Sequence, residues 1–340
     1  MPDNLTKFHA SKFSLFLALS ATLLTFIVIG LGAYTRLTDA GLGCPDWPGC
    51  YGQWFLDPKA IADPAFNSKK AWTEMIHRYM AGSLGILIFG LAILTIKKSN
   101  RTRRTLGFPI ALVILLIFQA LLGMWTVTLK LFPVVVMAHL LGGMTTLVLL
   151  WWYALKLLPP LHTSFKKESF KKLRRWGLVA LVTLGVQLLL GGWTSANYAA
   201  LVCLDFPSCQ MPADFRFNFF ETFHLGASVS NSTGEPLNLN ARISIQLLHR
   251  IGALLTFLSV SIFALSSWHC GVSRYIRMLS LLTLSLLVIQ VLLGISNVLL
   301  LLPLKVAVAH NCTAAALLLC LITLFYYLNT SILYQRDENA

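Results

Sequence analysis

Long apolar stretches separated by short polar segments dominate the chain. Eight of them approach the roughly 20 residues that a helix needs to cross a bilayer. Helices are the natural structure for such stretches, because the hydrocarbon offers no water to satisfy backbone groups. The predicted spans are 14–35, 75–96, 107–129, 134–157, 175–196, 243–268, 276–300 and 304–328. The pattern therefore predicts an all-α membrane protein with eight transmembrane helices.

The composition agrees with this class. Of the 340 residues, 56% are hydrophobic and only 12% are charged, whereas about a quarter are charged in ordinary soluble domains. A net charge of +14 would suit a nucleic-acid partner, but most of the basic residues fall in alternate loops such as 97–104 and 166–175. The positive-inside rule places those loops in the cytoplasm. We therefore expect a protein surrounded by the lipid of the cell (inner) membrane, with both termini cytoplasmic and no nucleic-acid partner.

The chain also contains an internal duplication. The outer-loop motif Cys44-Pro-Asp-Trp-Pro-Gly-Cys50 returns as Cys203-Leu-Asp-Phe-Pro-Ser-Cys209, and later motifs follow in the same order at nearly constant offsets. The later matches pair His77 with His249, Gln119 with Gln290, Gly123 with Gly294, and His139 with His310. Both halves begin on the same side, so the repeats are parallel and related by a pseudo-two-fold axis along the membrane normal. We predict two four-helix bundles, residues 1–160 and 161–340.

The candidate functional residues of these bundles are four intramembrane histidines: His77, His139, His249 and His310. An ionisable residue inside a membrane helix is costly and marks function by default. Two imidazoles at equal depth on facing helices can clamp a flat macrocycle, and bundle cores commonly hold such cofactors. A zinc or copper site usually needs three or four close ligands. Each half offers only two such histidines, so the pattern favours one haem site per half.

Charged residues beside the histidines allow two interpretations each. Glu74 shares a helical face with His77, either as a carboxylate beside the bound group or as an acid near the positive helix N-terminus. Arg78 and Arg250 each follow a histidine. They are candidates to pair with haem propionates, or to extend toward the membrane interface.

The two cysteine pairs lie in outer loops, in a compartment that tolerates disulfides. We expect disulfides between Cys44 and Cys50 and between Cys203 and Cys209. Exposed disulfides are often labile, so the sequence leaves open whether the pairs are structural or redox-active. It also assigns no role to the polar outer segment 210–241.

Together these features resemble the haem A synthase family, which acts in cytochrome oxidase biogenesis. The resemblance covers essentially residues 14–328 and is strongest over 32–48, from Gly32-Ala33-Tyr34-Thr35-Arg36 to Cys44-Pro45-Asp46-Trp47-Pro48. It implies an oxidoreductase that converts the C8 methyl of haem O into a formyl group, giving haem A with oxygen from water. An electron acceptor, which the sequence does not identify, is required, and haem O synthase is an expected donor of substrate.

The resemblance also implies roles for single residues. His249 and His310 would hold a resident haem b in the C-terminal half, and His77 and His139 would hold the substrate haem. Glu74 would act at the substrate methyl. Its counterpart in the second half is Gln246, which suits one catalytic site and one cofactor site.

Two other classes remain open from the sequence. A di-haem b-type electron-transfer cytochrome would share the histidines, but it would hold two permanent haems and make no haem A. A transporter would also use parallel repeats, although paired histidines and outer disulfides are less natural there.

Overall fold

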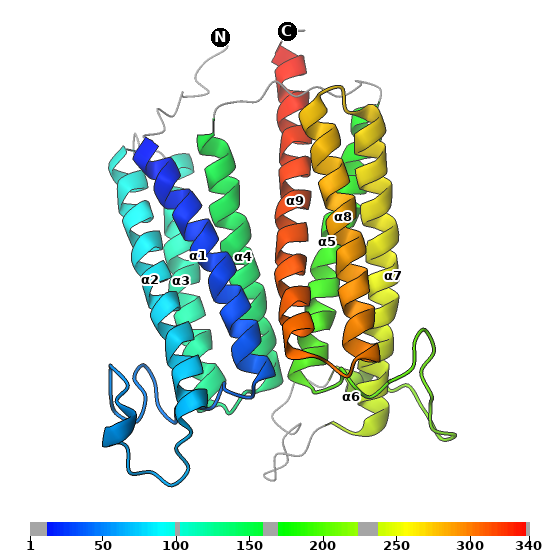
Figure 1. The fold of residues 1–340 in the computed structure, drawn as a ribbon. Coiled ribbons are helices and arrows are strands. Elements are labelled where there is room, and N and C mark those ends of the chain that lie inside the picture. Colours follow the sequence, from blue (N-terminus) through cyan, green and yellow to red (C-terminus); the bar gives the residue numbers. More distant parts are fainter. Residues whose placement is uncertain (1–11, 99–102, 159–168, 224–236, 338–340) are drawn as a thin grey trace.

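Eight long helices make up the molecule (Figure 1). The computed structural model describes residues 12–98, 103–158, 169–223 and 237–337. Within these residues the long helices are α1 (Lys12–Leu37), α2 (Ser68–Lys98), α3 (Arg103–Thr128), α4 (Pro133–Leu157), α5 (Phe170–Ala196), α7 (Leu239–Cys270), α8 (Arg274–Leu299) and α9 (Leu304–Asp337). All eight are long and apolar enough to cross a membrane, and the described residues form no strand. The prediction of an all-α membrane protein is confirmed.

Several helices begin earlier than the hydropathy pattern indicates, and capping side chains set the first turns of two of them. Asn67 precedes α2 and its side chain accepts a hydrogen bond from the amide of Lys70, 3.1 Å away. Asn238 caps α7 in the same way through the amide of Ala241. Such caps satisfy donors that the first helical turn leaves free. Glu74 consequently lies beyond the first turn of α2, where the helix dipole has little effect.

The helices form two groups that stand side by side (Figure 1). In the first group α2 and α4 each pack on both α1 and α3, and in the second group α7 and α9 each pack on both α5 and α8. Helices α2 and α4 are therefore diagonal across their bundle, as are α7 and α9. The loops that follow α1 and α5 lie at one end of the helices, opposite the start of α1 and the end of α9.

The two bundles share an apolar core. Helices α1 and α4 pack on α9, and α4 also packs on α5. Ile29, Met144 and Leu147 from the first bundle belong to the same buried cluster as Phe263 and Leu321 from the second. This contact buries apolar surface continuously across the boundary. The proposed division at 160/161 falls in 159–168, outside the described residues, and stays a prediction.

Backbone conformation repeats between the halves as well. Asp39 after α1 and Tyr198 after α5 have φ of 50° and 51°. The turns after α3 and α8 likewise carry positive φ at Leu131 (60°) and Leu302 (60°). Positive φ is uncommon for residues other than glycine. These matching positions support the duplication that the sequence motifs indicate.

Candidate functional site

Each of the four histidines faces a glycine on a neighbouring helix. A Cβ atom placed on Gly32 would lie 3.1 Å from Cε1 of His77, and one on Gly123 would lie 3.4 Å from Cε1 of His139. The second half repeats this arrangement at 3.3 Å for Gly191 against His249 and 3.2 Å for Gly294 against His310. The missing side chain at each glycine therefore makes the space that the imidazole edge occupies.

The histidine pairs sit on diagonal helices. His77 lies on α2 and His139 on α4, while His249 lies on α7 and His310 on α9. No residue of 131–143 is fully buried, although α4 packs on α1, α3, α5 and α9. Every residue of this stretch therefore keeps part of its surface accessible.

Buried polar atoms without partners surround these pairs. Nδ1 of His77, His139 and His310 lacks a hydrogen bond, and so does Oε1 of Gln119 and Gln290. Buried polar groups are nearly always satisfied in native proteins. Imidazole nitrogens without a partner fit the axial ligands of a haem, which bind iron through a ring nitrogen. Among the described residues no group of three or more His, Cys, Asp or Glu side chains gathers as a metal site, so a zinc or copper centre is not favoured there.

The glycine contact at His249 gives a direct test. Replacing Gly191 with alanine should push the His249 ring aside, because the new methyl group would be 3.3 Å from Cε1. We expect haem to dissociate about tenfold faster from the second half, the lower range for disturbed outer-shell groups. Transfer of haem from the purified protein to apomyoglobin measures the rate.

Gly185 on the same helix is the matched control, because a Cβ there would meet nothing within 4 Å. Gly185→Ala should leave haem release unchanged. Equal release from the two variants would show that the imidazole does not depend on the glycine.

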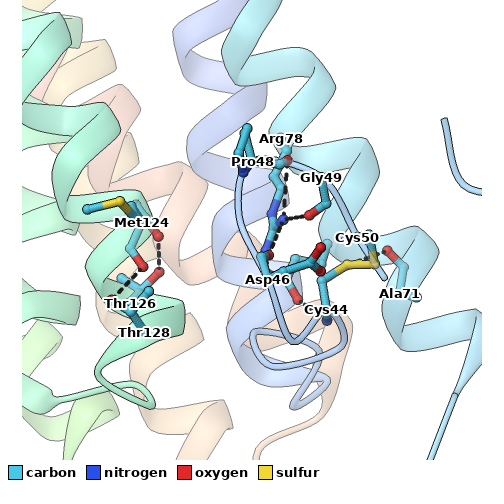
Figure 2. A network of polar contacts seen from close by, with 12 residues as sticks. Cys44, Asp46, Pro48, Gly49, Cys50, Ala71, Arg78, Met124, Thr126 and Thr128 are labelled. Atoms are coloured by element: carbon cyan, nitrogen blue, oxygen red, sulfur yellow. Dashed lines mark hydrogen bonds and ion pairs between the residues drawn. A yellow bond between two sulfur atoms is a disulfide. The ribbon is translucent and has the colours of Figure 1, made fainter. Parts of the chain in front are cut away.

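Glu74 and Arg78 connect α2 to the first disulfide loop, and Figure 2 shows Arg78 beside Asp46, Pro48 and Gly49 of that loop. Oε2 of Glu74 accepts a hydrogen bond of 2.9 Å from the amide of Cys44, and Oε1 pairs with the guanidinium of Arg78. Arg78 also donates to the carbonyl of Asp46 at 2.9 Å and to the carbonyl of Gly49. The Glu74 side chain is only 5% exposed. The carboxylate lies one turn from His77, so it links the histidine helix to the loop.

The disulfides predicted for the loops after α1 and α5 are present. Cys44 is bonded to Cys50 and Cys203 to Cys209, with Cα–Cα distances of 4.9 Å and 5.0 Å. In the first loop the carboxylate of Asp46 accepts hydrogen bonds of 2.7 Å from the Tyr51 and Gly52 amides. Burial and the carboxylates of Asp63 and Asp46 raise the pKa of Tyr51.

Arg250 holds the second disulfide loop as Arg78 holds the first. Its guanidinium donates to the carbonyls of Ser208 at 2.7 Å, Cys203 at 2.8 Å and Pro207 at 3.1 Å. Gln246 replaces the carboxylate, and its amide donates to Ala200 at 3.3 Å. Both arginines therefore have loop carbonyls as partners. Their binding to propionates stays a prediction.

Arg250→Lys should loosen the second loop, because an ammonium group lacks the planar fork that reaches several carbonyls at once. We expect a membrane-impermeant phosphine to reduce Cys203–Cys209 several-fold faster than in the wild type. Maleimide labelling of the freed thiols measures the rate. Arg216→Lys changes an exposed arginine of the same outer segment and should have no effect. If both substitutions leave the rate unchanged, Arg250 does not secure the loop.

The end of the helices that carries the disulfide loops also has an apolar pocket. An apolar pocket of about 270 Å³ lies between α4 and α5, lined by Met137, Val186, Leu189, Leu190, Trp193 and Phe223. The short helix α6 (Phe219–Thr222) lies beside it, and Nε1 of Trp193 donates to the carbonyl of Thr222. The residues that line this pocket include no acid or base, so they cannot transfer a proton. Residues 224–236 of the polar segment 210–241 fall outside the described residues.

The sequence analysis missed several residues of the site. Gln187 donates a hydrogen bond to the carbonyl of His249 at 3.0 Å and contacts Nδ1 of that ring at 3.1 Å. Arg36 joins the two halves through the carbonyl of Ser195 at 2.9 Å and the hydroxyl of Tyr198 at 3.1 Å. The position of Gln187, four residues before a glycine like Gln119 and Gln290, is the signal that would have found it.

The structure thus defines a duplicated helical membrane protein with two diagonal histidine pairs and two arginine-held disulfide loops. A family model described as "Cytochrome oxidase assembly protein" matches residues 15–322. The heme A synthase of Shewanella oneidensis is 42% identical over 320 residues, which cover 89% of this chain and 93% of that protein. The heme A synthase of Nitrosospira multiformis is 27% identical over 323 residues, 87% of each chain. The chain belongs to the haem A synthase family of cytochrome oxidase assembly proteins.

Proposed function

We propose that this protein is a membrane oxidoreductase that converts the C8 methyl group of haem O into the formyl group of haem A. The observation that carries this function is the asymmetry between two otherwise duplicated sites. Both halves keep a diagonal histidine pair, but only the first keeps a carboxylate, Glu74, where the second has Gln246. One site is therefore suited to chemistry and the other to a resident cofactor.

His249 and His310 hold haem b in the second half. An axial histidine binds iron through one ring nitrogen and normally gives the other nitrogen a partner of its own. Nδ1 of His310 has no partner, and Nδ1 of His249 is contacted by Gln187. When bound, haem b supplies an iron centre that carries electrons away from the substrate site. The protein supplies ligation, orientation and a low dielectric.

His77 and His139 orient the substrate haem O in the first half. Conversion of the methyl group with one water molecule yields the formyl group, four protons and four electrons, so an oxidising acceptor is required. Glu74 stabilises positive charge developing at the methyl carbon or accepts a proton from the attacking water. Its hydrogen bonds to Cys44 and Arg78 fix the carboxylate one turn outward of His77.

The protein lies in the cell (inner) membrane with its disulfide loops outside and both termini in the cytoplasm. The basic ends of the helices support this orientation, with Lys97, Lys156, Lys171 and Arg274 at the end opposite the disulfides. Haem O synthase is the proposed source of substrate, because haem O is apolar and its transfer within the membrane avoids water.

Purified protein given haem O and ferricyanide in heavy-oxygen water tests the reaction. We expect haem A whose formyl oxygen comes from the water. Haem A incubated without protein measures the exchange of its aldehyde oxygen and corrects for it. Haem A without label beyond exchange would contradict the water route, and the absence of haem A would contradict the function.

A further inference from the structure

A four-residue spacing recurs on the helix that faces each histidine. Three of the four glycines that contact a histidine have glutamine four residues earlier: Gln119 before Gly123, Gln187 before Gly191, and Gln290 before Gly294. Residues four apart share one helical face. Each glutamine therefore points toward the same histidine as its glycine.

The three glutamine amides contact those histidines. Nε2 of Gln119 donates to the carbonyl of His139 at 3.1 Å. Nε2 of Gln187 contacts both the carbonyl and Nδ1 of His249, and Nε2 of Gln290 lies 3.2 Å from Nε2 of His310. The Oε1 atom of all three is buried without a partner, so each amide has an acceptor available for a ring N–H.

His77 is the exception. The residue four before Gly32 is Val28, which has no polar side chain. His77 interacts with the main-chain carbonyl of Val28, but its Nδ1 has no hydrogen bond of ordinary geometry. His139 and His310 make the same weak contact with the main chain of Gln119 and Gln290, so His77 differs from them in having no glutamine side chain beside it.

We propose that the three glutamines are positioning residues that lock their histidines as haem ligands, and that Val28 leaves His77 the loosely held ligand of an exchangeable site. This inference rests on the proposed function, in which the first half admits haem O and releases haem A. The second half has two supported imidazoles and retains its haem. In the first half Gln119 holds only the main chain of His139 and no glutamine lies beside His77, so ligation by His77 must also order its ring.

A glutamine beside a histidine needs a small residue three positions after that histidine, and this requirement sets the design of the test. A Cβ at Gly142 would lie 2.1 Å from Nε2 of Gln119, and one at Gly252 would lie 2.3 Å from Oε1 of Gln187. Each of these glycines comes three residues after the supported histidine. At the same place Thr313 follows His310, whereas Met80 follows His77. A glutamine at position 28 therefore needs a smaller residue at position 80.

The test combines Val28→Gln with Met80→Thr, which reproduces the Gln290–Thr313 arrangement in the first half. Holoprotein carrying haem O and haem b is mixed with excess apomyoglobin, and the transferred haems are separated by chromatography. In the wild type we expect haem O to leave faster than haem b. The double variant should slow haem O release about 10- to 100-fold, the range for outer-shell partners of metal ligands. Low-temperature EPR of the ferric protein should also show an altered signal for the first site.

Val28→Leu with Met80→Thr is the matched control, because it changes size without adding an amide, and it should release haem O at the wild-type rate. Gln187→Val is the reciprocal variant and should speed haem b release about 10- to 100-fold. Unchanged rates and EPR signals in both glutamine variants would overturn this inference while the function stands. A wild type that holds no haem in either half would instead overturn the proposed function.

Discussion

His249→Ala is expected to remove haem b from the second half almost completely, because the substitution deletes one of the two proposed axial ligands. The protein should still fold and insert, since His249 is only one of many contacts between α5 and α7. Haem A formation should be lost with the cofactor. The extracted haem b per chain, together with the optical spectrum of the purified protein, measures the effect.

His77→Ala is the matched variant in the first half. This variant should keep haem b at the wild-type level and lose haem A formation, because His77 is the proposed ligand of the substrate haem and not of haem b. Loss of haem b from His77→Ala with retention in His249→Ala would reverse the assignment of the two halves. Retention of all haem in both variants would contradict histidine ligation altogether.

Glu74→Gln is expected to slow haem A formation by roughly 10²- to 10⁴-fold, the range for loss of a general acid or base. The substitution suits this purpose because a glutamine oxygen still accepts the Cys44 amide hydrogen bond while the negative charge is lost. Haem b content and the Cys44–Cys50 disulfide should be unaffected. The rate of haem O conversion, measured by chromatography of extracted pigments, checks the prediction.

Gln246→Glu is the control, since it places a carboxylate at the equivalent position of the second half. It should leave haem A formation close to the wild-type rate. If Glu74→Gln converts haem O as fast as the wild type, Glu74 serves only to hold the disulfide loop to α2.

Hydropathy and duplication were enough to predict most of the architecture. A transmembrane helix must be long and apolar whatever its neighbours are. The predicted span 134–157 therefore matches α4, Pro133–Leu157, almost to the residue. The cysteine pairs were also readable, because a short loop brings their backbones together. The early start of α2 could not be predicted in this way, because it depends on the capping side chain of Asn67 and not on hydrophobicity.

Contacts between helices were harder to predict. The sequence singled out Gln119 and Gln290 but not Gln187, and it gave no reason to notice Val28. Which helix faces which histidine depends on the rotation of each helix about its axis. Likewise Arg78 and Arg250 follow histidines in the sequence, but their partners are loop carbonyls that only the folded loops bring within reach.

Pigment analysis tests the central claim most directly. The protein is expressed with and without a haem O synthase and purified in detergent, and its acid-extracted haems are separated by chromatography. The account predicts haem b under both conditions and haem A only when haem O is supplied. Two haem b per chain under both conditions, without haem A, would contradict it and identify an electron-transfer cytochrome.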